Sequence, residues 1–87
     1  MVYIMSRVIP LFYAEPGRKY KVISFVRKGF GWRRRLEEIG FVPGQVFEVV
    51  FNNRGYIVVE IRGSRFGISP GIARKIFIEG VNSEIRA

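Results

Sequence analysis

The stretch from Gly29 to Gly44 constrains the fold more than any other part of the chain, because it predicts one short helix with a defined end. Its apolar residues follow the 3.6-residue period of an amphipathic helix: Trp32, Leu36 and Ile39. Gly40 stands where a left-handed residue would end the helix, and Pro43 cannot resume it. We therefore expect about two turns of helix starting near Trp32. A helix this short is marginal alone and needs a sheet to pack against.

Most of the remaining sequence alternates in a way that is typical of short strands. Five strands are expected, near residues 19–26, 45–51, 56–62, 65–69 and 75–79. Two of them show the alternation most clearly, with Phe47, Val49 and Phe51 on one face of the second strand and Ile57, Val59 and Ile61 facing the core from the third. A turn at 52–55 joins these two strands, and a single tight turn follows residue 69.

Five short strands cannot form two full sheets, so closure into a small barrel is the expected way to remove exposed edges. An OB-like barrel is the main alternative, but its helix normally falls between the third and fourth strands. Here the helix follows the first strand. We therefore expect a mainly β fold, a small five-stranded SH3-like barrel with one short helix after the first strand. The expected organisation is an N-terminal extension at 1–9, one domain at 10–80 and a C-terminal tail at 81–87.

The chain has a formal net charge of +8, and the whole excess lies between Arg18 and Arg35. That segment contains no acidic residue and eight basic ones, namely Arg18, Lys19, Lys21, Arg27, Lys28, Arg33, Arg34 and Arg35. Arginines in the first helical turn lie at the positive end of the helix dipole, where an anionic group would be favourable. The candidate partner-binding residues are therefore Lys28, Trp32, Arg33, Arg34 and Arg35. The alternatives are a solvated basic surface without a dedicated partner and, for Trp32, packing in the core.

The composition argues against several classes of protein. The chain has no cysteine, histidine or aspartate, so nucleophilic triads, disulfides and most zinc sites are excluded. We expect no enzymatic activity and no cofactor, and no ligand set for a transition metal is visible. No apolar stretch approaches the ~20 residues of a membrane span. A cytoplasmic protein is expected.

Several motifs together carry a resemblance to a known family. They are Pro10-Leu11, Gly17, Val22-Ile23, Arg34-Arg35-Leu36 with Ile39-Gly40-Phe41-Val42-Pro43-Gly44, Phe47-Glu48-Val49-Val50, Ile61-Arg62-Gly63 and Ala73-Arg74-Lys75-Ile76. Over about residues 10–80 the chain resembles the FeoA family of ferrous iron transport accessory proteins. The Arg35-to-Gly44 run is the most specific part of this likeness.

The resemblance implies a small cytoplasmic SH3-like barrel that acts with FeoB, the membrane iron transporter with a cytosolic G-domain, rather than carrying iron. It places the protein peripheral to the inner membrane through that partner. The same module also occurs as the C-terminal domain of metal-dependent repressors of the DtxR type. By matching position, Arg34, Arg35 and Leu36 are the start of the family's helix.

Three functional hypotheses follow. The first is an adaptor that docks its basic helix start on an acidic patch of FeoB or of the membrane surface and modulates transport. The second is nucleic-acid binding, because Tyr20, Phe25, Phe30 and Trp32 are interleaved with the basic residues of 18–35. The third is weak self-association through an open edge of the sheet.

Overall fold

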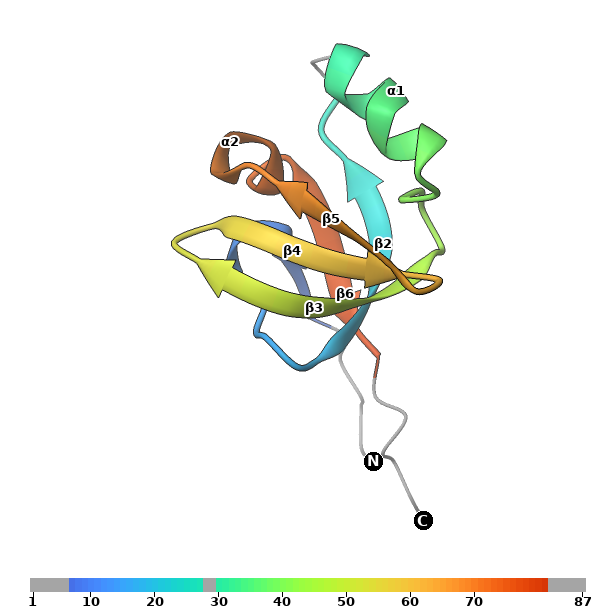
Figure 1. Ribbon diagram of the computed structural model, residues 1–87. Coiled ribbons are helices and arrows are strands. Elements are labelled where there is room, and N and C mark those ends of the chain that lie inside the picture. Colours follow the sequence, from blue (N-terminus) through green and yellow to red (C-terminus); the bar gives the residue numbers. More distant parts are fainter. Residues whose placement is uncertain (1–6, 28–29, 82–87) are drawn as a thin grey trace, which may run out of the picture.

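The computed structural model describes residues 7–27 and 30–81, which form one antiparallel sheet with short helical segments (Figure 1). The elements are β1 (Val8–Pro10), the 3-10 helix η1 (Leu11–Tyr13), β2 (Lys19–Phe25), α1 (Phe30–Glu38), β3 (Val46–Asn53), β4 (Tyr56–Ile61), β5 (Ser64–Ile68), α2 (Pro70–Ala73) and β6 (Ile76–Gly80). The strand order is β1-β6-β2-β3-β4-β5.

The mainly β expectation is confirmed, with two corrections. Six strands are present in the described part of the chain rather than five, and the sheet is not closed, since β1 and β5 form its two ends. The additional strand is β1, which pairs antiparallel with β6 through Val8 and Glu79. It lies partly in the segment that we expected to be an extension. As a result α1 follows the second strand along the chain.

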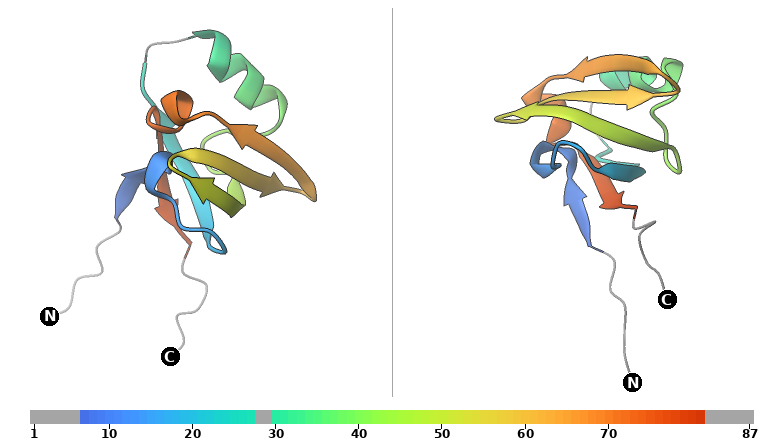
Figure 2. Two further views of the ribbon diagram at one scale, coloured as in Figure 1. Left: turned by 60° about the vertical axis from the view of Figure 1, so that its left-hand side comes forward. Right: turned by 60° about the horizontal axis from the view of Figure 1, so that its bottom comes forward.

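The core lies inside the bend of the sheet and is closed at one end by η1 and α2 (Figure 2). Its buried residues come from all the longer elements: Leu11, Ala14, Tyr20, Val22, Leu36, Phe41, Phe47, Val49, Ile57, Val59, Ile61, Ile68, Ala73, Ile76 and Ile78. The expectation for β4 is confirmed, because Ile57, Val59 and Ile61 are all buried. Alternation along β4 therefore places every second side chain in the core.

A β-bulge in β3 overturns the expected face of Phe51. Val49 is opposite Val59, but Phe51 is opposite Val58, so one extra residue stands between the two pairs. Val49 is fully buried, whereas Phe51 is 47% exposed. Beyond the bulge, the alternation of the side chains between the two faces of β3 is shifted by one residue. Asn52 therefore stands opposite the buried Ile57. Strict alternation of apolar and polar residues in the sequence does not predict this shift.

The helix α1 begins at Phe30, two residues before the expected start, and ends where the sequence predicts. The expected place of the arginines in the first turn is therefore wrong, because Arg34 and Arg35 lie beyond that turn and Arg35 stands in the last turn. Gly40 has a φ of +88°. Its N–H donates to the carbonyl of Glu37 at 3.0 Å, and the N–H of Phe41 donates to the carbonyl of Leu36 at 2.9 Å. These two bonds form a Schellman motif, which satisfies carbonyls that the helix end leaves free. Leu36 and Phe41 are both buried, so the motif also fixes α1 to the core.

Candidate partner-binding groove

A groove of about 440 Å³ separates α1 from β5 and α2. This is within the usual size range of ligand clefts, roughly 300–1,000 Å³. Its walls are mostly apolar and come from two regions far apart in sequence: Trp32, Arg35, Leu36 and Ile39 on one side, and Phe66, Gly67, Ile68, Ser69 and Ile72 on the other. We call this the α1–β5 groove. It exists because α1 lies beside the end strand of the sheet rather than flat on its face (Figures 1 and 2).

The helix wall of the groove is one face of α1, continued by Ile39 directly after the helix. Trp32, Arg35, Leu36 and Ile39 stand at i, i+3, i+4 and i+7, which brings their side chains to the same side of a helix. Leu36 is buried, and Trp32 and Ile39 pack partly against the core. The predicted stripe of Trp32, Leu36 and Ile39 is therefore confirmed as a packing stripe. Arg35 belongs to the same face.

Trp32 takes part both in packing and in the groove. Its ring packs edge-to-face on Phe25, with centroids 5.8 Å apart and an interplanar angle of 89°. Its indole Nε1 is buried and has no hydrogen-bond partner among the described residues. An unsatisfied buried donor of this kind costs about 1–3 kcal/mol. The ring also lines the groove, so the two roles expected as alternatives occur in the same side chain.

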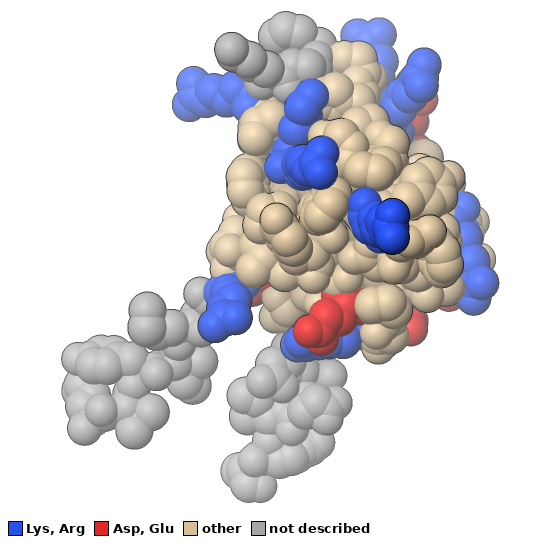
Figure 3. All heavy atoms as spheres, turned by 90° about the vertical axis from the view of Figure 1, so that its left-hand side faces the viewer, with Lys and Arg blue, Asp and Glu red and all other residues tan. Residues whose placement is uncertain are grey.

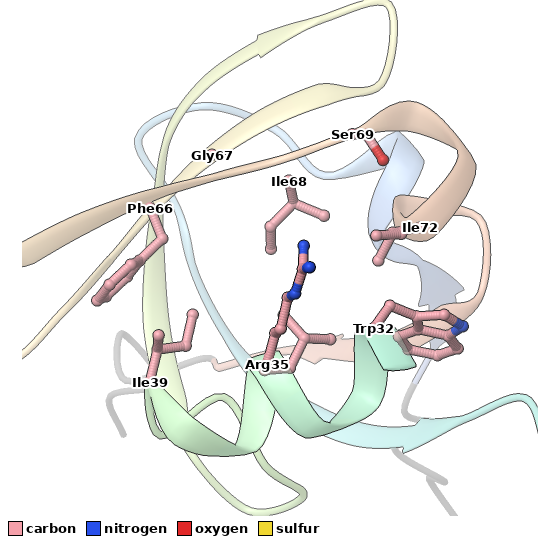
Figure 4. A pocket seen from close by; sticks show the side chains of 9 residues that line it. Trp32, Arg35, Ile39, Phe66, Gly67, Ile68, Ser69 and Ile72 are labelled. Carbon is pink, nitrogen blue, oxygen red and sulfur yellow. The ribbon is translucent and has the colours of Figure 1, made fainter. Parts of the chain in front are cut away.

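Arg35 is the charged residue of the groove. Figure 4 shows its side chain extending from α1 towards Ile68 on β5. Ile39 and Phe66 lie to one side of it, and Trp32 and Ile72 lie to the other. The groove is thus divided into two apolar ends with a guanidinium between them. Such an arrangement suits a ligand that carries a negative charge between two apolar groups.

The other predicted basic residues do not enter the groove. The guanidinium of Arg33 lies over the ring of Phe25, 5.5 Å from its centroid, and Arg34 is exposed. The spacing allows i,i+4 pairs of Arg33 with Glu37 and Arg34 with Glu38, in the weaker order with the basic residue first. Neither forms an ion pair in the described part of the chain. Lys28 lies outside the described residues.

Elsewhere the basic charge is dispersed. Figure 3 shows Lys and Arg side chains as separate groups on a largely uncharged face. Arg18 pairs with Glu15 at 3.3 Å, and Arg65 pairs with Glu60 at 3.0 Å. Both pairs are solvent-exposed and contribute little to stability. The described Lys and Arg side chains therefore do not form one continuous basic stripe on this face.

The wall of the groove formed by β5 and α2 was not predicted. Phe66 and Ile68 alternate as a strand should, but nothing local indicates that they face residues 32–39. Within the described ranges, no group of three or more His, Cys, Asp or Glu side chains is placed to hold a metal ion. No described helix is long and apolar enough to span a membrane.

Comparison with known proteins gives consistent matches. The FeoA domain family matches residues 9–80. The Fe(2+) transport protein A of Methanocaldococcus jannaschii is 30% identical over 70 residues, covering 80% of this chain and 84% of that protein. The crystal structure of an iron uptake regulatory protein (FeoA) superposes with a TM-score of 0.74 at 28% identity, covering 86% of this chain and 99% of the other.

A manganese-dependent transcriptional repressor has the same fold at much lower identity. It superposes with a TM-score of 0.78 at 16% identity, over 90% of this chain and 44% of the repressor. At that identity the likeness concerns the fold alone. It agrees with the expectation that this module also occurs inside larger metal-dependent repressors.

Proposed function

The chain belongs to the FeoA family, which is involved in ferrous iron transport, and we propose that it is a non-enzymatic adaptor of that process. In this proposal it binds a FeoB-type membrane transporter on the cytosolic side and modulates its activity. The protein is then cytoplasmic and reaches the inner membrane through its partner. The acidic membrane surface is a secondary contact, made by the basic residues outside the groove.

The observation that carries the proposal is Arg35 in the α1–β5 groove. A guanidinium flanked by aromatic and aliphatic side chains has the composition of an interface hot spot, in which Trp and Arg are the most enriched residues. Arg33 and Arg34 lie on the same helix and make no ion pair with described residues. They are suited to steer an acidic partner towards the groove.

A binding experiment with the cytosolic domain of the FeoB-type transporter of the same organism tests the adaptor proposal. We expect the wild-type chain to bind and the variant Arg33/Arg34/Arg35→Ala to lose most of the affinity. The matched control is Lys19/Lys21/Lys75→Ala, which removes the same formal charge from β2 and from the residue before β6. If both triple variants bind equally, the three arginines of α1 have no specific role. If the wild-type chain does not bind, the adaptor proposal is wrong.

The geometry gives less support to nucleic-acid binding. Single-strand binders need exposed aromatic rings on which bases stack. Tyr20 is only 3% exposed, and Phe25 is half-buried beneath Trp32 and Arg33. The interleaved aromatic residues described in the structure are therefore used for packing. A titration with single-stranded DNA at low salt is the appropriate specificity control for the adaptor experiment.

A further inference from the structure

We propose that the α1–β5 groove binds an extended segment of a protein partner, which adds as a strand to the open edge of β5 and places a carboxylate on Arg35. The expected pattern of that segment is apolar-x-acidic-x-apolar. This inference rests on the adaptor function proposed above and specifies how the partner is recognised. It follows from three features of the described residues: the backbone of β5, the position of Arg35 and the spacing of the apolar ends.

The first feature is the open edge of β5. Among the described strands β5 has one neighbour, β4, with Ile61 opposite Ser64 and Val59 opposite Phe66. The turn between Ile61 and Ser64 has two residues, Arg62 and Gly63, with φ of +52° and +85°. That is the geometry of a type I′ hairpin, in which the two flanking residues exchange both backbone hydrogen bonds.

The hydrogen-bonding pattern of the rest of β5 follows from this turn. In an antiparallel pair, hydrogen-bonded and non-hydrogen-bonded positions alternate. Phe66 and Ile68 therefore bond to β4, whereas the N–H and C=O groups of Arg65 and Gly67 point to the open side. Gly67 lines the groove and has no side chain, so its contribution to the wall is its backbone. The groove thus presents a donor and an acceptor to an incoming strand.

The second feature is the position of Arg35. It is the charged residue of the groove and makes no ion pair with described residues, because the two pairs on the surface involve Arg18 and Arg65. Glu37 and Glu38 are exposed and do not line the groove. A carboxylate entering between α1 and β5 would therefore meet a guanidinium able to bind it through two hydrogen bonds.

The third feature is the spacing of the two apolar ends. Trp32 on α1 and Ile39, the residue after α1, are seven residues apart, which corresponds to about 10 Å along a helix axis. Side chains i and i+4 of a strand lie on one face about 13 Å apart, with i+2 between them. A segment with apolar residues at i and i+4 and an acidic residue at i+2 therefore fits the groove (Figure 4). One apolar side chain would contact Ile39 and Phe66, and the other would contact Trp32 and Ile72. The acidic side chain between them would meet Arg35.

Overlapping twelve-residue peptides that cover the cytosolic part of the FeoB-type transporter are the probes for this proposal. We expect binding, measured by fluorescence anisotropy, from at least one peptide with the apolar-x-acidic-x-apolar pattern. Replacing its acidic residue with the matching amide should weaken binding about tenfold for the wild-type chain, and much less for Arg35→Gln. Arg7→Gln is the matched control and should behave like the wild type, because Arg7 is exposed and precedes β1, at the opposite end of the sheet from β5. Equal urea midpoints of the two variants exclude a folding defect.

Strand addition is tested separately by N-methylation of the bound peptide. Methyl groups on the alternate amides that face β5 should abolish binding, whereas methyl groups on the other amides should leave it nearly unchanged. Slower amide exchange at Arg65 and Gly67 in the complex is the corresponding result on the protein. If the intact cytosolic domain binds but no peptide does, or both methylated sets bind equally, strand addition is wrong and the adaptor function stands. A dimer that Arg35→Gln dissociates would place a second copy in the groove and overturn the proposal.

Discussion

The side-chain amide of Asn52 donates a hydrogen bond of 2.7 Å to the carbonyl oxygen of Ala14, which joins the β3–β4 hairpin to the segment after η1. The same amide donates to the carbonyl of Phe12 at 3.1 Å, and its oxygen accepts from the N–H of Gly55 at 2.9 Å. One side chain thus fixes both the hairpin turn and the η1 segment.

Asn52→Ala is expected to lower the free energy of unfolding by about 2–3 kcal/mol, because it leaves partly buried backbone groups without partners. The neighbouring Asn53 is exposed, and Asn53→Ala should change stability by no more than about 0.5 kcal/mol. Urea unfolding followed by circular dichroism measures both. Equal losses for the two variants would contradict a special role for Asn52.

Two glycines in equivalent turns allow the cost of an overlap with Phe12 to be measured separately from the cost of backbone strain. Gly55 and Gly63 both have positive φ, +91° and +85°, in two-residue turns. A Cβ on Gly55 would overlap the ring of Phe12, whereas one on Gly63 would meet open space. Gly63→Ala should therefore cost about 1–2 kcal/mol from backbone strain alone. Gly55→Ala should cost a further ~1–3 kcal/mol from overpacking.

The Phe12→Ala background is the control for this pair. In that background the ring is gone, so Gly55→Ala and Gly63→Ala should cost the same. The measurement is again the free energy of unfolding in urea. If the difference between the two glycine variants persists without the ring, it does not come from the contact with Phe12.

Most of the fold follows from local signals. The longer strands begin and end within two residues of their predicted positions, because alternation and turn chemistry are encoded within a few residues. Gly40 ends α1 as predicted for the same reason. The three-residue strand β1 was missed, since Val8–Pro10 shows no alternation and owes its conformation to β6 at the far end of the chain. Whether the sheet closes also depends on tertiary geometry.

The positive φ of Arg62 offers a stabilising substitution. The left-handed region destabilises most residues by about 1–2 kcal/mol, whereas glycine and asparagine adopt it readily. Arg62 has a φ of +52° and is exposed. Arg62→Asn should therefore raise the free energy of unfolding by about 0.5–1 kcal/mol. Arg27→Asn, at an exposed residue without positive φ, should give no gain in a thermal melt. A gain of equal size at both sites would mean that the loss of a positive charge, and not the backbone conformation of Arg62, raises the stability.

The bulge in β3 predicts opposite sensitivities for two residues that the sequence places on one face. Val49 is fully buried, and Val49→Ala should cost about 2 kcal/mol. Phe51 is 47% exposed, and Phe51→Thr should change stability by no more than about 0.5 kcal/mol. Denaturant midpoints of the two variants provide the test. A larger loss at Phe51 than at Val49 would mean that the strand continues without the bulge.

The candidate site could be predicted only in part. The density of positive charge between Arg18 and Arg35 is a property of the sequence alone, and it predicts Arg33, Arg34 and Arg35 as candidate site residues. The structure separates them: Arg35 lines the groove, and Arg33 lies over Phe25. The opposite wall comes from residues 66–72, and nothing in the local pattern shows that β5 is the open end of the sheet facing α1.

Trp32 provides a direct signal for occupation of the groove, because it is the only tryptophan in the chain and lines the groove while remaining partly exposed. A partner segment between α1 and β5 would remove water from its ring, so its emission should shift to shorter wavelength and be less quenched by acrylamide. Trp32→Phe should abolish this signal and reduce the affinity only modestly, since another aromatic ring keeps most of the apolar contact. Binding of the transporter domain with unchanged Trp32 emission would place the interface elsewhere, away from the groove that Arg35 divides.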